Sequence, residues 1–152
     1  MKKDNSIIIG TGVIGGYLSK LLLSKRQRVI VTSRKIKKSY TNYNKLNIEN
    51  KVIFEELDVL KKNEILKLLK KYTPKNIFYF SGQSSLTKSI KLKKTTNDSI
   101  YIGAKKFLEI LHKYKLKTNF YKANSGYILE PKKGLVNIKS KISKNKNPYI
   151  LS

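Results

Sequence analysis

The sequence predicts an α/β fold, in which a doubly wound parallel sheet carries helices on both faces. Short apolar runs that suit buried strands alternate along the chain with segments whose apolar residues recur at helical spacing. The connections between them are short, and parallel strands joined by right-handed helical crossovers satisfy that pattern. A glycine-rich turn also follows the first apolar run directly and opens the first helical segment.

Five segments are predicted to be strands, and we expect them to form a sheet in the order 3-2-1-4-5. The first two are continuous apolar runs, which fit strands buried on both faces, and the others are rich in aromatic and β-branched residues. In chain order they are residues 6–9 (SIII), 28–32 (RVIVT), 51–57 (KVIFEEL), 76–80 (NIFYF) and 118–123 (TNFYKA).

Three segments are predicted to be helices: residues 13–24 (VIGGYLSKLLLS), 61–72 (KKNEILKLLKKY) and about 98–114. The second is amphipathic and ends at Thr73, because Pro74 biases the residue before it away from helical geometry. The polar stretch between the second strand and residue 50 is predicted to be a loop with room for a turn of helix.

Composition divides the chain into two parts. Residues 1–123 hold every predicted element, whereas residues 124–152 are dominated by Lys, Asn, Gly and Pro and show no clear element. A doubly wound sheet usually has a sixth strand. We therefore expect a dinucleotide-binding domain over 1–123 that stops before that strand, followed by an irregular tail over 124–152.

The residue counts exclude several kinds of site. The 152 residues include no cysteine and one histidine, which rules out thiolate nucleophiles, disulfides and histidine or cysteine metal clusters, so we expect no metal. No apolar run approaches the roughly 18–20 residues of a membrane span. We expect a cytoplasmic protein.

The net charge of +25 suggests binding to polyanions. Only Arg26, Arg28 and Arg34 of the 34 basic residues are arginines, although specific readers of base edges rely on the guanidinium group. The lysines are scattered along the whole chain. We expect weak, salt-sensitive adhesion without a specific nucleic-acid site, and a lysine-rich polyanion-binding protein stays as an alternative.

The sharpest motif is a G-x-G-x-x-G that follows the first strand, made of Gly10, Thr11, Gly12, Val13, Ile14 and Gly15. Glycines at this spacing let the backbone turn tightly and approach a pyrophosphate, whose charge meets free N–H groups at the helix start. The motif predicts a dinucleotide site, and the alternative is a glycine-rich turn without a ligand.

The end of the second strand bears on the choice of cofactor. Ser33, Arg34 and Lys35 stand where an NAD-specific site would place an acidic residue. No carboxylate is present to repel a 2′-phosphate, and Arg34 could bind one through its planar donors, so NADP is favoured and NAD stays open. The alternative is that Arg34 and Lys35 are two more cations in a lysine-rich chain, without a role in binding.

Motifs along nearly the whole chain resemble those of a known family. They are the turn and helix GVIGGYLSKLLL at 12–23, LDV at 57–59, YFSGQS at 79–84, IGAKKFLE at 102–109 and FYKANS at 120–125. Together they resemble the extended short-chain dehydrogenases/reductases that act on nucleotide sugars, which are epimerases and dehydratases. The likeness is closest to the N-terminal half of GDP-mannose 4,6-dehydratase, and it implies a Rossmann-type sheet.

The resemblance implies roles for particular residues. Asp58 and Val59 would lie against the adenine, and Ser81, Gly82 and Gln83 would lie beside the nicotinamide ribose. Ser125 and Tyr149 match the spacing of the catalytic pair. Tyr149 would take the proton of a sugar hydroxyl while hydride passes to the nicotinamide, and Ser125 would hydrogen-bond the same oxygen.

The resemblance also implies partners, and it has limits. A GDP-sugar is the favoured substrate, and the helix at 98–114 would pair two copies into a homodimer. The lysine expected four residues after Tyr149 falls beyond Ser152, and Tyr127 replaces the glutamate that removes a sugar proton in the dehydratases. We therefore expect this chain by itself to be inactive, and a catalytically silent dinucleotide-binding fragment is the leading alternative.

Overall fold

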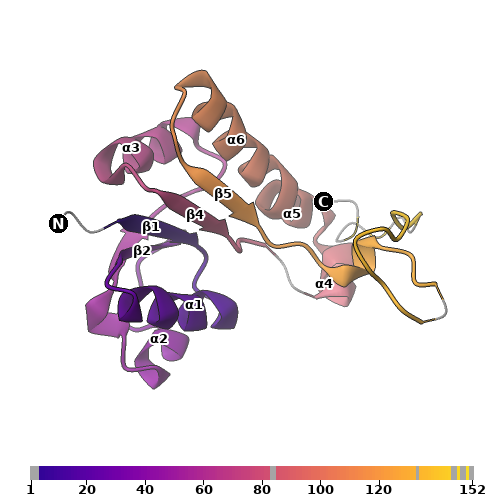
Figure 1. Ribbon diagram of the computed structural model, residues 1–152, viewed down its shortest axis with the longest axis horizontal. Helices are drawn as coiled ribbons and strands as arrows, with labels where there is room; N and C mark the ends of the chain where they lie inside the picture. The colour runs from indigo at the N-terminus through magenta and orange to yellow at the C-terminus, as the bar shows by residue number, and fades with distance from the viewer. Residues whose placement is uncertain (1–3, 83–84, 133, 145–146, 148–149, 151–152) are drawn as a thin grey trace.

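The computed structural model describes residues 4–82, 85–132, 134–144, 147 and 150 (Figure 1). Five strands form one sheet in the order β3-β2-β1-β4-β5, and every neighbouring pair is parallel. The strands are β1 (Asn5–Ile9), β2 (Arg28–Ser33), β3 (Ile53–Glu56), β4 (Asn76–Tyr79) and β5 (Asn119–Lys122). The predicted fold class and strand order are confirmed.

β1 lies at the centre of the sheet and is paired on both edges. Ile7 pairs with Ile30 of β2 on one side and with Ile77 of β4 on the other. The side chains of residues 6–9 are all buried, as a strand covered on both faces requires. The apolar run SIII therefore marks the middle of the sheet.

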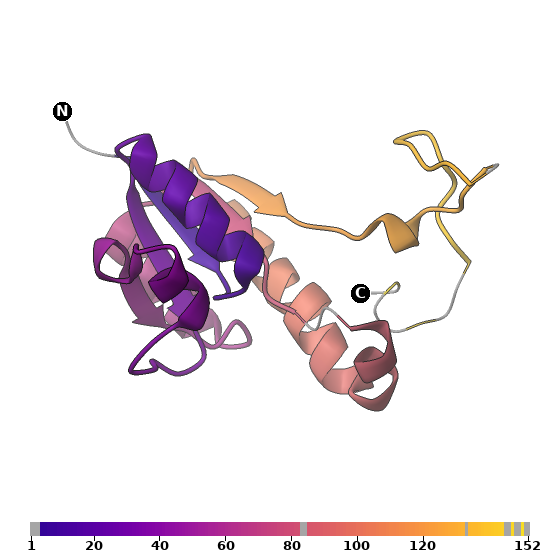
Figure 2. The ribbon, with the colours of Figure 1, turned by 90° about the horizontal axis from the view of Figure 1, so that it is seen from below.

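Helices cover the sheet on both faces (Figures 1 and 2). On one face lie α1 (Val13–Ser24) and the short α2 (Thr41–Lys45), and on the other lie α3 (Lys62–Tyr72) and α6 (Gly103–Lys113). Because successive strand side chains point to opposite faces, Ile8 packs towards α1 while Ile7 and Ile9 pack towards α3 and α6.

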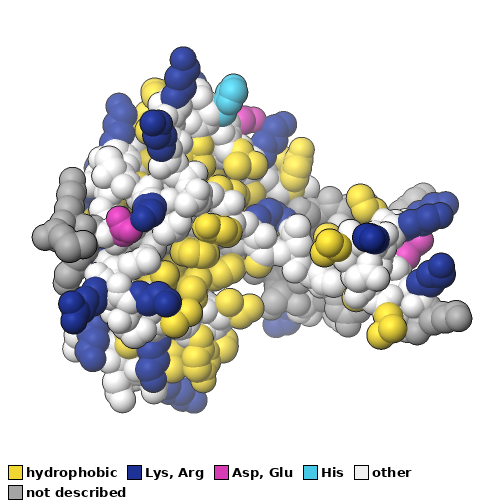
Figure 3. Space-filling model, viewed as in Figure 1, with side chains coloured by type: hydrophobic (Ala, Val, Ile, Leu, Met, Phe, Trp, Pro, Cys, Tyr) yellow, Lys and Arg dark blue, Asp and Glu magenta, His cyan; other side chains and the backbone are white. Residues whose placement is uncertain are grey.

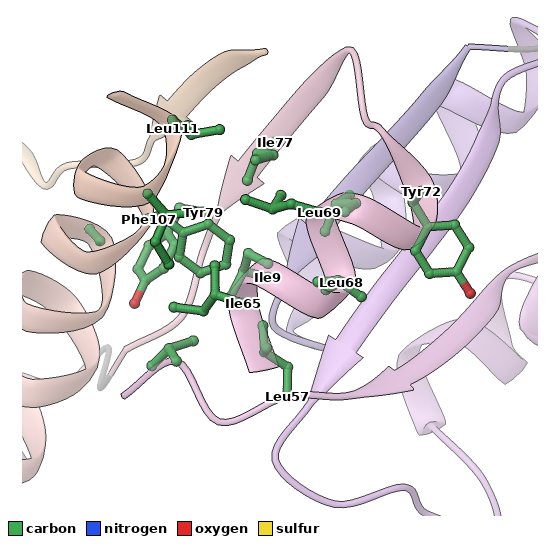
Figure 4. Close-up of a cluster of buried hydrophobic side chains, with 14 of the residues drawn as sticks. Ile9, Leu57, Ile65, Leu68, Leu69, Tyr72, Ile77, Tyr79, Phe107 and Leu111 are labelled. Carbon is green, nitrogen blue, oxygen red and sulfur yellow. The ribbon is translucent and has the colours of Figure 1, made fainter. Parts of the chain in front are cut away.

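The core under α3 and α6 is the larger of the two. Figure 4 shows side chains of α3, α6 and the sheet pointing toward one another between these layers. Tyr79 of β4 makes an edge-to-face contact with Phe107 of α6, with ring centroids 5.8 Å apart. These contacts explain the apolar spacing of α3 and α6.

The third predicted helix is longer and less regular than its sequence indicates. It begins with α4 (Leu86–Lys91) and α5 (Lys93–Asn97), which are separated at Leu92, and it passes through a π-helical turn (Asp98–Ile102) before α6. Leu92 has φ −114° and ψ 44°, which interrupts the helix. The lysine-rich sequence 86–97 lacks the apolar period that would reveal it.

The described residues after β5, which are 123–132, 134–144, 147 and 150, have little regular structure. They contain a 3₁₀ turn (Gly126–Ile128) and two isolated bridges, which join Leu129 to Ile142 and Lys132 to Leu135. Figure 2 shows this segment running out past the end of the sheet. No helix in the described part of the chain has the length and apolar character needed to cross a membrane.

One surface of the molecule carries many hydrophobic side chains. Figure 3 shows them gathered on the face over α1 and the β4–β5 side of the sheet. The exposed members on these elements are Val13, Ile14, Tyr17, Leu21 and Tyr121. α1 has a single lysine in its twelve residues, in contrast to the lysine-rich α3 and α6.

Glu55 ties β3 to α3, and its replacement should lower stability in a pH-dependent way. Its Oε1 accepts hydrogen bonds from Lys71 and Tyr72. Burial raises the pKa of Glu55, but these hydrogen bonds outweigh it, so the pKa lies below its usual value. A depressed carboxyl pKa stabilises the fold above the unfolded-state pKa, and this contribution is lost as pH falls through the folded-state value.

We expect Glu55→Gln to lower the free energy of unfolding by about 1 kcal/mol at neutral pH. The difference from wild type should shrink below about pH 4, where the unfolded carboxyl titrates. Urea unfolding between acidic and neutral pH measures both. Glu109→Gln is the control, because its ion pair with Lys62 is exposed and worth little. A Glu55→Gln effect that stays constant with pH would contradict this account.

Candidate functional site

Because all five strands are parallel, the loops that follow them lie at one edge of the sheet, where doubly wound folds bind their ligands. The glycine turn follows β1 at this edge. Gly10 has φ 112°, a conformation that favours glycine. A Cβ on Gly10 would lie 3.2 Å from the carbonyl oxygen of Phe80, so the turn passes close to the end of β4.

The start of α1 has the features of an anion site. Gly12 is its N-cap residue, and no side chain caps the helix. The first-turn N–H groups and the helix dipole therefore favour a negative charge there. A Cβ on Gly12 would meet no atom within 4 Å, so protein packing does not require glycine at this position. Ile14 in this turn is 67% exposed.

Gly15 has a different role in the same motif. A Cβ there would lie 3.0 Å from the carbonyl oxygen of Gly10 and 3.2 Å from Cγ2 of Ile8. A side chain at this position would crowd these atoms, so glycine lets α1 pack closely on β1. The open space at Gly12 and the uncapped helix fit a pyrophosphate, and the tight packing at Gly15 sets the position of the helix.

The loop after β2 brings cations to the same edge. Ser33 is half-buried, and Arg34 and Lys35 are exposed. The loop reaches the glycine turn through Asn42, whose Nδ2 donates a hydrogen bond to the carbonyl oxygen of Thr11 at 3.3 Å. Thr11 is half-buried at this contact. Residues expected at the pyrophosphate and at the adenine ribose therefore lie on connected segments.

The loop after β3 separates the two residues expected at the adenine. Asp58 is half-buried, and its Oδ1 accepts a hydrogen bond from the N–H of Leu60 at 2.9 Å. Val59 is buried, and its Cγ2 would lie 2.7 Å from a Cβ on Gly103 of α6. The side chain of Val59 is therefore a core contact, and Asp58 is the member of the pair with an accessible side chain.

The loop after β4 is held close to the π-helical turn. Gly82 has φ 153°, and a Cβ there would lie 2.5 Å from Cγ1 of Ile100. Ser81 is half-buried, and Gln83 lies outside the described residues. Burial raises the pKa of Tyr79 well above its usual value, and its hydroxyl donates to the carbonyl oxygen of Ser99 at 2.6 Å. The Tyr79 hydroxyl therefore stays protonated at neutral pH, and its role is structural.

Ser125 follows β5 and lines a cavity of about 460 Å³. The other lining residues are Gly126, Leu129, Pro131, Val136, Ser143 and Ile150. Tyr149 lies outside the described residues, so its place relative to Ser125 stays a prediction. Ile150, its neighbour in sequence, shares the cavity with Ser125.

The structure adds one charged residue that the sequence did not single out. Lys122 ends β5, and its Nζ donates a hydrogen bond to Oδ1 of Asn124 at 2.7 Å. Burial lowers the pKa of Lys122 below its usual value. Lys122 lies two residues after the half-buried Phe120, and residues two apart in a strand face the same way. This spacing was the signal in the sequence that Lys122 would be half-buried too. Among the described residues, no group of three His, Cys, Asp or Glu side chains could hold a metal ion.

The sequence of this chain matches a known family over most of its length. The family is described as GDP-mannose 4,6 dehydratase, and the match covers residues 7–127. The chain belongs to the GDP-mannose 4,6-dehydratase family. This confirms the resemblance to nucleotide-sugar dehydratases and epimerases. No curated protein matches the chain in sequence.

Solved structures of nucleotide-sugar epimerases share the fold of this dehydratase-family chain. The UDP-glucose 4-epimerase of Brucella ovis, in complex with NAD, has a TM-score of 0.82 and 17% identity, over 97% of this chain and 44% of that one. The UDP-Glc/GlcNAc 4-epimerase of Campylobacter jejuni has a TM-score of 0.83 and 17% identity, over 97% of this chain and 45% of that one.

A third structure is the UDP-glucose 4-epimerase of Thermotoga maritima with UDP-glucose, which has a TM-score of 0.77 and 20% identity, over 97% of this chain and 47% of that one. At these identities the likeness shows the fold alone, which is Rossmann-like. The chain spans less than half the length of these proteins.

A substitution beneath the site tests how tightly its loops are packed. A Cβ on Gly103 would lie 2.2 Å from the Tyr79 hydroxyl and 2.7 Å from Cγ2 of Val59. We expect Gly103→Ala to lower the free energy of unfolding by about 1–3 kcal/mol through overpacking, although alanine is the better helix former. Gly126→Ala is the control, because a Cβ there meets no atom within 4 Å. Equal stability of both variants in urea unfolding would refute the packing.

Proposed function

We propose that this chain binds NADP across the carboxyl edge of its sheet and is the cofactor-binding part of a nucleotide-sugar dehydratase or epimerase. The observation that carries the proposal is Gly12, a glycine that the protein's own packing does not need, at the uncapped start of a helix in a chain of this family. Backbone at such a position can approach a pyrophosphate closely, which a side chain would prevent.

The preference for NADP rests on the loop after β2. Arg34 is exposed beside the site, and its planar donors suit a phosphate group. The Ser33 side chain could donate to the same group. Asp58 would lie beside the adenine, with Val59 supporting it from the core, and Ser81, Gly82 and Gln83 would flank the nicotinamide ribose. Relatives solved with NAD share only the fold, so NAD is the alternative cofactor.

The proposed chemistry is the oxidation of a sugar hydroxyl. When bound, the nicotinamide supplies the acceptor for the hydride that leaves the sugar carbon. Tyr149, as phenolate, would accept the hydroxyl proton, and Ser125 would donate a hydrogen bond to the same oxygen. A free phenol has a pKa near 10, so Tyr149 needs a neighbouring cation to act at neutral pH. A GDP-sugar is the proposed substrate.

The proposal extends to organisation and assembly. Residues 1–123 would form the cofactor-binding domain, and residues 124–152 would carry the catalytic pair. The helical segment 98–114 would pair two copies of the chain, and it exposes Tyr101, Leu108 and Tyr114. We propose a cytoplasmic location.

Two other functions deserve a test. A catalytically silent dinucleotide-binding module would bind the cofactor without turning over a substrate. This alternative keeps the proposed cofactor site and lacks only the proposed oxidation of the sugar. A polyanion-binding protein would use the net charge of +25, and its affinity would fall steeply with salt. The salt dependence separates it from a dinucleotide site.

NADPH should stabilise the chain selectively. At a concentration one hundred times its Kd, a ligand adds about 2.7 kcal/mol of stability, which raises the Tm of a domain this size by roughly 5–10 °C. Thermal unfolding with NADPH, NADH or neither, at about 50 and 200 mM salt, measures this. We expect a larger rise with NADPH that survives the higher salt. A rise with neither nucleotide, or one abolished by salt, would count against the dinucleotide site.

Gly12→Val separates a binding glycine from a structural one. The backbone of Gly12 has φ −72° and ψ 178°, which valine can adopt, and its Cβ would meet open space. We expect the free energy of unfolding without ligand to change by less than about 1 kcal/mol, and the affinity for NADPH to fall at least about tenfold. Urea unfolding and calorimetric titration measure the two. An unchanged affinity would mean that no pyrophosphate lies against Gly12.

A further inference from the structure

We propose that the short helix α2 is a strut that couples the two ends of the dinucleotide site, with Tyr40 and Tyr43 as positioning residues that set affinity and cofactor selectivity. This inference rests on the proposed function. Tyr40 is the N-cap residue of α2 and Tyr43 lies within it. Both side chains are buried, and we assign neither of them a contact with the cofactor.

Tyr43 supports the glycine turn from the sheet side. A Cβ on Gly15 would lie 3.2 Å from the Tyr43 hydroxyl, so this hydroxyl lies directly under the first turn of α1. Ser19 lies beside it and donates a hydrogen bond to the carbonyl oxygen of Gly15 at 2.7 Å. Burial raises the pKa of Tyr43 to about 12, and the nearby Ser19 hydroxyl lowers this pKa by a smaller amount. The phenol is therefore a neutral support for the proposed pyrophosphate site.

Tyr40 holds the loop that carries the cations. Its hydroxyl accepts a hydrogen bond from the N–H of Lys37 at 3.2 Å and donates one to the carbonyl oxygen of Lys35 at 3.3 Å. Its own N–H donates to Oε1 of Glu49. These bonds fix the backbone immediately after Arg34, the residue proposed to meet the 2′-phosphate.

The two tyrosines form one unit with the sheet. Their rings meet edge to face, with centroids 6.3 Å apart, and both pack on Phe54 beside β2. Asn42 lies between them in the chain and donates to the carbonyl oxygen of Thr11. A Cβ on Gly16 would lie 3.2 Å from Cδ1 of Leu46, so α2 also rests closely on α1. A shift of α2 therefore moves both subsites.

The two hydroxyls should have separable effects. Tyr40→Phe keeps the stacked ring on Phe54 and removes both loop hydrogen bonds, so we expect the affinity for NADPH to fall about three- to tenfold while NADH affinity stays unchanged. Tyr43→Phe removes the support under Gly15, so we expect both affinities to fall by a similar factor. Its stability without ligand should not fall, because no hydrogen bond of that hydroxyl to the described residues meets standard geometry.

The test is calorimetric titration of wild type, Tyr40→Phe, Tyr43→Phe and the exposed control Tyr121→Phe with NADPH and NADH. An Arg34→Gln background adds a double-mutant cycle, in which Tyr40→Phe should have no further effect on NADPH if it acts through Arg34. Tyr40→Phe weakening both nucleotides equally, or Tyr43→Phe weakening neither, would overturn the inference.

Amide hydrogen exchange without ligand tests the strut separately from cofactor binding. Tyr40→Phe should speed exchange at the Lys37 amide, and Tyr43→Phe should speed it at the Gly16 amide. Unchanged exchange at both positions would overturn the strut even if NADPH binds. If both variants exchange faster than wild type at these amides but wild type binds neither nucleotide, the role of α2 as a strut stands and the proposed function is rejected.

Discussion

β1 is buried on both faces and paired on both edges, and this position determines where every loop of the candidate site lies. Its pairing with β2 and β4 is parallel, so the chain must leave each strand at the same edge and return by a helix. The turn at Gly10 passes beside the carbonyl oxygen of Phe80, so the loops after β1 and β4 lie close together. The loops after β1, β2 and β4 lie close together because β2 and β4 both pair with this one buried apolar strand.

The glycines show which constraints come from the protein and which point to a ligand. Gly10, Gly15 and Gly103 lie where a side chain would meet protein atoms, so the fold itself explains them. Gly12 lies against open space at an uncapped helix start, so it points to an occupant from outside. The tyrosines of α2 then connect this point to the loop of Arg34.

The sequence predicts the strands and the glycine turn well, because both depend on local patterns that burial imposes directly. It predicts room for a turn of helix in the polar stretch where α2 lies, but it does not place that turn, because a five-residue helix has no period to detect and its stability comes from contacts of Tyr40 and Tyr43 with Phe54. It gives no sign of the π-helical turn. The support under Gly15 and the half-buried position of Lys122 depend on residues distant in sequence. Gln83 and Tyr149 lie outside the described residues, so the roles that the family resemblance implies for them stay predictions.

The most direct test of the dinucleotide site is an NMR titration of ¹⁵N-labelled chain with NADPH, which reports the position of binding residue by residue. We predict that the amide shifts concentrate in the turn from Gly10 to Gly15 and after β2, β3 and β4, at Arg34, Asp58 and Gly82. Shifts spread instead over the lysine-rich surfaces of α3 and α6, with the glycine turn unmoved, would contradict the site and indicate binding by charge alone.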